Sequence, residues 1–273
     1  MKIAFWNVCK KENLDELIIN LLLEYNIDIM VLAEYTGDIK KLCERVNDLD
    51  FRYLPLDATA VGCDMITGLY NSGYSQCSLF ARDRYYITSF ETTCFNLLLA
   101  LIHAPSNLYS SDSDRRIYFS EFYKDIENCE KLSSISNSVV LGDLNSNPYE
   151  DSIISAGALH SIPYKEEAIK EKRTVNGVQY NTFYNPSWRL LFQNKPPYGT
   201  YYYSSSKYLN RFWNVFDQVI IRPCLIDAFV DDSLFIVSKI KDVSLLKAGY
   251  KPNKKTYSDH LPIVFELKEE KIR

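Results

Sequence analysis

The N-terminal part of the chain repeats one pattern twice: a short apolar run, followed by a stretch in which apolar residues recur at helical spacing. The short apolar runs 2–8 and 28–33 are typical of buried strands, and a stretch with helical spacing of its apolar residues follows each of them. These stretches predict helices over 14–25, with Asn13 as the cap, and over 38–48. The chain is therefore predicted to open as strand, helix, strand, helix.

The pattern then changes to short apolar segments separated by Gly, Asn, Ser and Asp, which are typical of strands and turns. A long helix is predicted over 114–131, and Asn147-Pro148 predicts a further helix that ends near Gly157. The predicted strands are 66–70, 77–81, 85–90, 95–102, 138–141, 215–221, 234–237 and 261–267. The least regular segment is 165–208. This mixture of helices and hairpin-like strands favours an α+β layered domain.

Composition limits the class of protein. The chain has 273 residues, of which 47% are hydrophobic and 24% charged, so it can form a large core without disulfides or metals. A net charge of −4 argues against a protein that coats nucleic acid through bulk positive charge. The seven cysteines are an odd number without a C-x-x-C pair, which favours reduced thiols. With no secretory segment and no apolar run long enough to cross a bilayer, we expect a soluble cytoplasmic protein that does not engage membranes.

Polar residues follow or interrupt several of the predicted strands, and chemistry commonly gathers at such positions. Asp217 lies inside the apolar run VFDQVII, so it is either paired in the interior or exposed at a sheet edge. Asp143 and Asn145 flank Leu144, so an extended segment would point both side chains to one face, where they could hold an oxygen or a metal. The alternative for this pair is an Asx-turn that leads into the next helix. The segments concerned are FWN at 5–7, LAE at 32–34, HAP at 103–105, GDLN at 142–145, FDQ at 216–218 and SDHLP at 258–262.

These segments, in this order, resemble the endonuclease/exonuclease/phosphatase superfamily, which includes deoxyribonuclease I and abasic-site endonucleases. GDLN and SDHLP, with FDQ between them, carry most of the resemblance, which runs from Ile3 to Glu266. It implies one catalytic domain over residues 1–273, with an α+β fold. That fold is a four-layer α/β/β/α sandwich of two packed mixed sheets flanked by helices.

The resemblance also implies the site residues. Mg²⁺, for which Mn²⁺ could substitute, would be held mainly by Glu34, with Asn7 and Asp259 in support, because hard divalent ions prefer oxygen ligands. Asp143 would orient or deprotonate the attacking water, Asn145 would fix its position, and Asp217 would pair with His260. His103 would contact the phosphate or protonate the leaving oxygen. Cys9 stands where abasic-site enzymes have an aspartate, and neither Asp64 nor another acid is fixed as the partner of His103.

For the function, the resemblance implies a metal-dependent phosphodiester hydrolase, most simply a nuclease that acts on DNA or RNA and leaves a 5′-phosphate. The alternative within the superfamily is a phosphatase or phosphodiesterase that acts on inositol phosphates or another small phosphoester. A scaffold without activity is disfavoured, because no motif residue is missing. The aromatic segment 198–213 suits either stacking on unpaired bases or a hairpin whose tyrosines pack on the sheet. The candidate substrate contacts are Arg82, Tyr201, Lys207 and Arg211.

Overall fold

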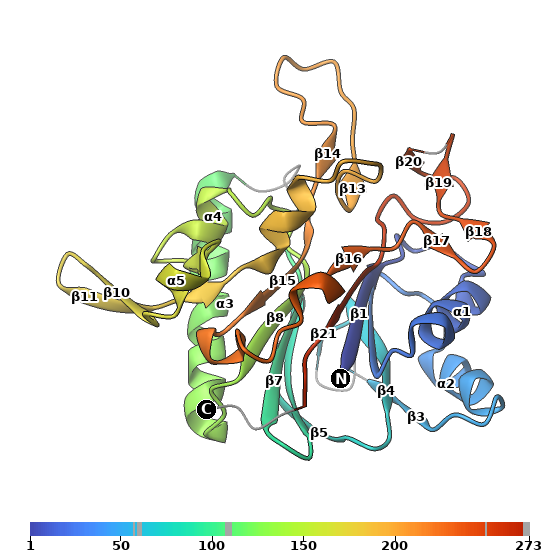
Figure 1. Cartoon of the computed structure of the whole chain (residues 1–273), viewed down its shortest axis with the longest axis horizontal. Coiled ribbons are helices and arrows are strands. Elements are labelled where there is room, and N and C mark those ends of the chain that lie inside the picture. Colours follow the sequence, from blue (N-terminus) through green and yellow to red (C-terminus); the bar gives the residue numbers. More distant parts are fainter. Residues whose placement is uncertain (57, 59–61, 107–110, 249, 270–273) are drawn as a thin grey trace.

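The computed structural model describes residues 1–56, 58, 62–106, 111–248 and 250–269. Two large β-sheets pack face to face, and helices cover their outer faces (Figure 1). Helices α1 (Asp15–Tyr25) and α2 (Ile39–Asn47) flank one sheet, and α3 (Asp112–Ser133) flanks the other. The predicted four-layer α+β sandwich is therefore confirmed.

The first sheet, here called sheet A, has the strand order β16-β21-β1-β2-β4-β3. Its two central strands β1 and β2 run parallel, and all other neighbours are antiparallel. Parallel pairing brings the C-terminal ends of β1 and β2 to the same edge of the sheet. Its strands are β1 (Lys2–Asn7), β2 (Ile29–Ala33), β3 (Tyr53–Leu56), β4 (Ile66–Asn71), β16 (Phe235–Ile236) and β21 (Ile263–Glu266).

The second sheet, sheet B, has the strand order β5-β6-β7-β8-β15-β12-β9. Its central pair β7 and β8 is parallel, and β15 runs antiparallel to β8. Its strands are β5 (Ser75–Arg82), β6 (Tyr85–Glu91), β7 (Asn96–His103), β8 (Ser138–Asp143), β9 (Ser161–Ile162), β12 (Phe183–Tyr184) and β15 (Asp217–Ile221).

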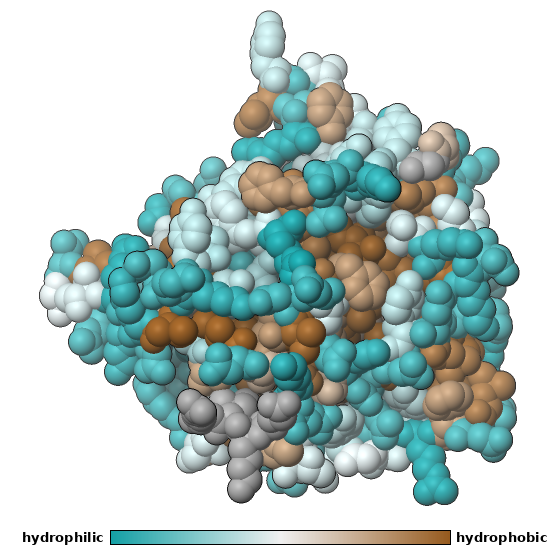
Figure 2. Space-filling view, in the orientation of Figure 1, coloured by the Kyte–Doolittle hydropathy of each residue, from teal (hydrophilic) through white to brown (hydrophobic). Residues whose placement is uncertain are grey.

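Short elements surround the two sheets. The loop between β13 and β14 projects from the molecule as a mostly polar extension (Figures 1 and 2). The described residues form four two-stranded pairs: β10 (Lys172–Val175) with β11 (Val178–Asn181), β13 (Tyr201–Tyr202) with β14 (Trp213–Asn214), β17 (Lys239–Ile240) with β18 (Val243–Ser244), and β19 (Leu246–Lys247) with β20 (Lys251–Pro252). The remaining helices are α4 (Asp151–Ile154), α5 (Lys165–Ala168), η2 (Pro186–Leu191), η3 (Pro223–Leu225) and η4 (Asp231–Ser233).

The core explains why the central strands are apolar on both faces. Phe5 and Leu141 are fully buried between the two sheets, where sheet A packs on sheet B. Ala4 points to the opposite face and packs with Ile18 of α1, while Val140 packs beneath α3. Alternate residues of each strand therefore enter different apolar layers, which produces the continuous apolar runs of the sequence.

Most predicted elements are present, several short ones were not predicted, and three differences concern the main elements. Asn13 does not cap α1: it has a positive φ of 61°, and Leu14 occupies the cap position without a side-chain hydrogen bond. The helix predicted from Pro148 is reduced to the single turn α4. Strand β3 was not predicted, because Pro55 interrupts it. Among the described residues, no helix is long and apolar enough to cross a membrane.

Candidate active site

Three polar side chains lie next to one another across the central strands of sheet B. The parallel register of β7 and β8 pairs His103 with Asp143, and the antiparallel register of β8 and β15 pairs Asp143 with Asp217. All three side chains are buried. Strand pairing thus assembles residues that are far apart in the sequence.

Gly142 allows this close packing. A Cβ atom at position 142 would lie 1.9 Å from the carbonyl oxygen of Ile102 on the neighbouring strand. A side chain there would push β8 away from β7 and displace Asp143 from His103. The glycine of the GDLN segment is therefore required by the backbone that carries the site.

Sheet A contributes two further residues at the adjoining edge. Asn7 pairs with Ala33 in the parallel register of β1 and β2, so Glu34 follows directly beside Asn7. The side-chain amide of Asn7 donates to Asp143 Oδ2 at 3.0 Å and to Glu34 Oε1 at 3.4 Å. Asn7 therefore joins the polar edges of the two sheets.

His260 and Asp217 form a buried pair. The Nδ1 atom of His260 lies 2.9 Å and 3.1 Å from the two carboxylate oxygens of Asp217, and its Nε2 atom lies 3.7 Å from Asp143 Oδ2. Ser258 holds this segment in place, since its hydroxyl donates to the Asn7 carbonyl at 2.6 Å and accepts from the His260 amide at 3.0 Å. The Asp217 carboxylate thus directs the opposite side of the imidazole ring toward Asp143.

Electrostatics favours the charged form of this imidazole. Burial alone lowers the pKa of His260, but the Asp217 and Asp143 carboxylates outweigh it and raise the pKa to about 10. Burial also raises the pKa of Asp217, while the interaction with His260 opposes that rise. At neutral pH the site therefore presents an imidazolium N–H close to Asp143.

His103 contacts both sheets. Its Nε2 atom lies 3.3 Å from Glu34 Oε1 and 3.7 Å from Asp143 Oδ2, whereas its buried Nδ1 atom has no hydrogen-bond partner among the described residues. The hydrogen bond from His103 is the main reason that the pKa of Glu34 is lowered, although burial opposes it, and Asn7 adds to the lowering. Glu34 is thus held as a carboxylate.

Of the two geometries expected for Asn145, an extended segment and an Asx-turn, the structure shows the turn. Asn145 has a positive φ of 48°, and its backbone N–H donates to Asp143 Oδ1 at 2.9 Å, which is an Asx-turn. Its side-chain amide donates to the Ala104 carbonyl at 2.9 Å. The two side chains therefore do not enclose one oxygen. Asn145 instead fixes the Asp143 carboxylate and ties the loop after β8 to the loop after β7.

Asp259 lies on the far side of this group, next to Cys9. Burial first, and then the charge of Asp259, raises the pKa of the Cys9 thiol to about 12. Asp259 also lines a surface cavity beside β20. The charge of Glu34 also raises the pKa of this thiol, so Cys9 lies near both predicted carboxylate ligands.

Two sets of atoms could hold a divalent cation. Asp143, Asp217 and His260 offer ligand atoms within 4.8 Å of one another, but both Asp217 oxygens already face His260 Nδ1. Asp143 is likewise surrounded by N–H groups. Glu34 is more open, because its contacts with Asn7 and His103 both use Oε1 and its side chain is 20% exposed. The Asn7 side chain is buried, and its Oδ1 accepts from the Cys9 amide at 2.9 Å, so the partly exposed Glu34 carboxylate is the group that best fits a hard cation with bound water.

The four predicted substrate contacts lie in different places. The ring of Tyr201 lies 4.7 Å from the His260 ring and stacks on Phe216 at 5.2 Å, so it belongs to the wall of the site. Arg82 lies on the outer strand β5, where it forms an ion pair with Asp125 at 2.9 Å. Lys207 lies in the loop between β13 and β14 and is exposed.

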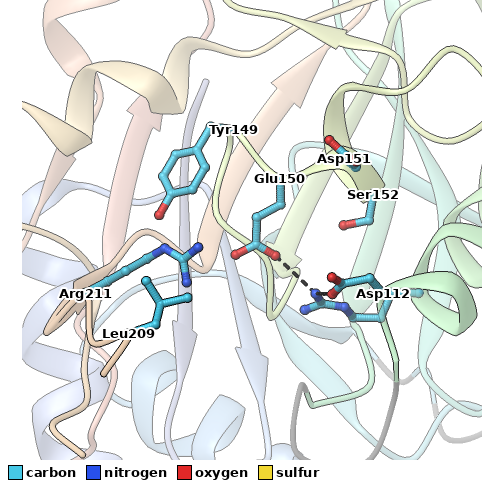
Figure 3. A pocket seen from close by; sticks show the side chains of 8 residues that line it. Asp112, Tyr149, Glu150, Asp151, Ser152, Leu209 and Arg211 are labelled. Atoms are coloured by element: carbon cyan, nitrogen blue, oxygen red, sulfur yellow. Dashed lines mark hydrogen bonds and ion pairs between the residues drawn. The ribbon is translucent and has the colours of Figure 1, made fainter. Parts of the chain in front are cut away.

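Arg211 enters a cavity of about 460 Å³ behind the loop that follows β8. Its guanidinium lies 5.6 Å from the centre of the Tyr149 ring, and Glu150 points into the same space (Figure 3). The cavity wall also includes Arg115, which is ion-paired to Glu150 at 3.3 Å. Arg211 is therefore separated from the wall that Tyr201 forms.

Residues that sequence analysis did not assign support the loop after β8. Arg115 donates to the Asn145 carbonyl at 3.1 Å, and Gln218 donates to the Ser146 carbonyl at 2.6 Å. Asn147 donates to Asn214 at 2.9 Å and accepts from the Val215 amide at 2.9 Å. Gln218 lies in the FDQ segment, which was a usable signal. Arg115 lies in a polar helix start, where nothing in the sequence distinguishes it.

Comparison with solved structures places this arrangement in a known fold. An AP endonuclease from Archaeoglobus fulgidus superposes with a TM-score of 0.58 at 16% identity, covering 98% of this chain and 99% of that chain. The human Nocturnin catalytic domain with bound sulfate superposes with a TM-score of 0.54 at 15% identity, covering 97% and 93%. TDP2 from D. rerio, complexed with a single-strand DNA product, superposes with a TM-score of 0.55 at 14% identity, covering 97% of each chain.

These neighbours are members of the endonuclease/exonuclease/phosphatase superfamily, and this chain has the same DNase I-like fold. No family model and no curated protein sequence matches the chain. The resemblance expected from the motifs is thus confirmed at the level of the fold.

Proposed function

We propose that the chain is a divalent-metal-dependent phosphodiester hydrolase, a nuclease that cleaves DNA or RNA as one catalytic domain. The observation that carries the proposal is the position of Asp143. Its Oδ2 atom lies 3.0 Å from the amide of Asn7 and 3.7 Å from both His103 and His260. A carboxylate held among three nitrogen groups, beside a more open glutamate, matches the needs of phosphodiester hydrolysis.

The metal is Mg²⁺, with Mn²⁺ as a substitute, and Glu34 and Asn7 hold it, with Asp259 in support. All three side chains offer oxygen atoms, and the Glu34 carboxylate remains charged because its pKa is lowered. When bound, the ion offsets the negative charge that develops on the phosphate and activates a water molecule.

The protein groups then divide the remaining work. Asp143 orients the attacking water and receives its proton, while Asn145 fixes the carboxylate from the backbone. The His260 imidazolium, held by Asp217, binds a phosphoryl oxygen. His103 donates to the leaving oxygen as the bond from phosphorus to that oxygen breaks.

Nucleic acid is the proposed substrate class. Its support comes from two neighbours with this fold, of which one is an AP endonuclease and another is a TDP2 bound to a single-strand DNA product. Within this chain, the Tyr201 ring beside His260 is placed to contact a base next to the reacting phosphate.

A substrate panel tests the proposal. Labelled single- and double-stranded DNA and RNA are incubated with Mg²⁺, with Mn²⁺ and with EDTA, and inositol phosphates are included as a separate arm. We expect cleavage of at least one nucleic acid that EDTA abolishes and that Asp143→Ala and His260→Ala both remove. Asp242→Asn, at an exposed turn, serves as the matched control. Phosphate release from inositol phosphates with every nucleic acid intact would overturn the proposed substrate class.

A further inference from the structure

A groove of about 520 Å³ opens beside Asp259 and shares no lining residue with the cavity of Figure 3. Two segments form it: residues 202–204 at the end of β13, and residues 247–248 and 250–255 around the β19–β20 pair. Figure 1 shows β13 and β20 at the same end of the molecule. The volume lies within the range of roughly 300–1,000 Å³ that small-ligand sites occupy.

The charge of this groove is opposite to that of the whole chain. Residues 247–255 read KAGYKPNKK, with four lysines and no acid, in a protein whose net charge is −4. Within the described part of the chain, none of these lysines has an acidic partner within salt-bridge distance. Lys165 and Arg189, by contrast, are paired with Asp231 and Asp232. The groove therefore presents cations that no protein carboxylate neutralises.

Aromatic rings are interleaved with these cations. The Lys251 ammonium lies 4.6 Å from the centre of the Tyr202 ring and 4.9 Å from that of Tyr250. Tyr203 and Tyr250 are 50% and 42% exposed. Exposed rings next to fixed positive charge are suited to stacking on bases and binding the phosphates between them.

The groove is continuous with the reacting groups. Asp259, which precedes His260 in the chain, lines the groove, and Tyr201, which precedes Tyr202, contacts His260 at 4.7 Å. The residues next to His260 and Tyr201 in the chain thus belong to the groove, so a strand whose phosphate lies at His260 would have the lysines of this groove close by.

We propose that this groove, called the lysine–tyrosine groove, binds the unpaired nucleotides of single-stranded DNA or RNA next to the cleaved phosphate. The inference rests on the proposed nuclease function and assigns it a substrate form. Base stacking on Tyr250 needs a free base face, which the interior of a duplex does not offer. The sequence segment expected to supply the cations, 198–213, supplies tyrosines here, whereas the lysines come from 247–255.

The test measures binding separately from cleavage. A short labelled single-stranded oligonucleotide is titrated with protein in EDTA, and fluorescence anisotropy gives Kd over a range of salt concentrations. The triple variant Lys247→Gln, Lys251→Gln, Lys254→Gln should weaken binding at least tenfold. It should also reduce the slope of log K against log salt by about 2, since each neutralised phosphate on a single strand contributes about 0.7. The matched control is Lys40→Gln, Lys41→Gln, Lys131→Gln, which changes the charge equally at exposed positions of α2 and α3.

The tyrosine is tested on its own. Tyr250→Ala should weaken single-strand binding roughly tenfold, and Tyr250→Phe should restore it, because stacking needs the ring and not the hydroxyl. Inorganic polyphosphate serves as a ligand with phosphates and no bases, and its binding should not respond to Tyr250→Ala. DNA and RNA strands of one sequence show whether the sugar matters.

Three results would overturn the assignment: equal weakening by the groove variant and the control variant, equal weakening of duplex and single-strand binding by Tyr250→Ala, or loss of polyphosphate binding in Tyr250→Ala. The proposed function is judged separately, by hydrolysis of a small aryl phosphodiester by the wild type with Mg²⁺. If that reaction fails while the groove binds single strands as expected, the nuclease proposal is wrong and the groove assignment stands as a binding site.

Discussion

At the site, the polar side chains of sheet B lie next to one another on neighbouring strands, whereas those of sheet A lie at a strand end and in the loops beside the strands. His103, Asp143 and Asp217 follow one another across β7, β8 and β15 in strict register. On sheet A, Asn7 reaches Glu34 through a long contact of 3.4 Å, and Asp259 turns toward Cys9.

This difference separates two chemical tasks. The sheet B carboxylates are buried and held by hydrogen bonds from Asn7, Asn145 and His260, so their positions are fixed before substrate arrives, which suits proton transfer and charge stabilisation. On sheet A, Asn7 is also buried, but the Glu34 carboxylate is 20% exposed and its contacts with Asn7 and His103 use only Oε1, which suits a cation that keeps several waters. Variants on the two sheets should therefore fail in different ways.

The largest effect is expected on sheet B. Asp143→Asn should lower kcat about a thousandfold, because the carboxylate that receives the proton becomes an amide of nearly the same shape. Because Asp143 is surrounded by N–H donors and not by open ligand atoms, we expect the Mg²⁺ concentration for half-maximal residual activity to stay close to that of the wild type. Steady-state kinetics over a Mg²⁺ series measures both. A strong rise in the Mg²⁺ concentration needed for activity would show that Asp143 is a metal ligand. The two sheets would then not have separate chemical tasks.

The complementary change is made on sheet A. Glu34→Gln should lower activity about a hundredfold and weaken metal binding tenfold or more, because it removes the charged oxygen at the open edge. In the wild type, saturating Mg²⁺ should stabilise the fold, by about 2.7 kcal/mol at a hundred times Kd, and Glu34→Gln should lose most of that gain. Thermal unfolding with and without Mg²⁺ measures this stabilisation, and Glu44→Gln on the exposed face of α2 is the control. Equal stabilisation of the wild type and Glu34→Gln by Mg²⁺ would show that Glu34 does not bind the metal.

A smaller effect is expected from the charge of the buried pair that His260 forms with Asp217 of sheet B. Because the pKa of His260 is raised to about 10, the folded protein holds a proton that the unfolded chain releases near its ordinary pKa of 6.5. The resulting stabilisation is complete below about pH 6.5 and is lost as the pH rises toward 10, with a slope of at most about 1.4 kcal/mol per pH unit.

Urea unfolding in EDTA between about pH 7 and pH 10 measures this slope. Asp217→Asn should flatten it, since the carboxylate that raises the pKa is gone. His160 does not interfere, because burial lowers its pKa and moves its titration below this window. An unchanged slope in Asp217→Asn would mean that another group titrates there.

How much of this could be predicted from the sequence depends on whether a signal is local. The ends of β1, β2, β7 and β8 were readable, because buried strands are apolar runs and Asn7, Glu34, His103 and Asp143 follow or end them. The strand order that brings these ends together is not local. The strand order depends on which apolar faces pack on one another. It could be predicted only from the resemblance of the motifs to a known superfamily.

Distant contacts also decide what the local pattern leaves open. The sequence allows Asn145 either an extended segment or an Asx-turn, and hydrogen bonds to Ala104 and from Arg115, which lie far away in the sequence, fit the turn. The lysine–tyrosine groove could not be predicted from the sequence, because its lysines and some of its tyrosines come from two segments that meet only in the folded chain. The contact of Asp259 with Cys9 is likewise not local, because the two residues lie near opposite ends of the sequence.

The smallest effect is expected at Arg82, the predicted substrate contact on the outer strand of sheet B. Its guanidinium already pairs with Asp125 at 2.9 Å, and its side chain is 48% exposed. Exposed ion pairs contribute about 0–1 kcal/mol, so Arg82→Gln should lower the free energy of unfolding by less than about 1 kcal/mol and change KM by less than about twofold. Denaturant unfolding and KM for a single-stranded oligonucleotide check both values. A KM rise of tenfold or more would mean that the guanidinium leaves Asp125 to bind phosphate, and sheet B would then supply substrate binding as well as the groups that act on the bond.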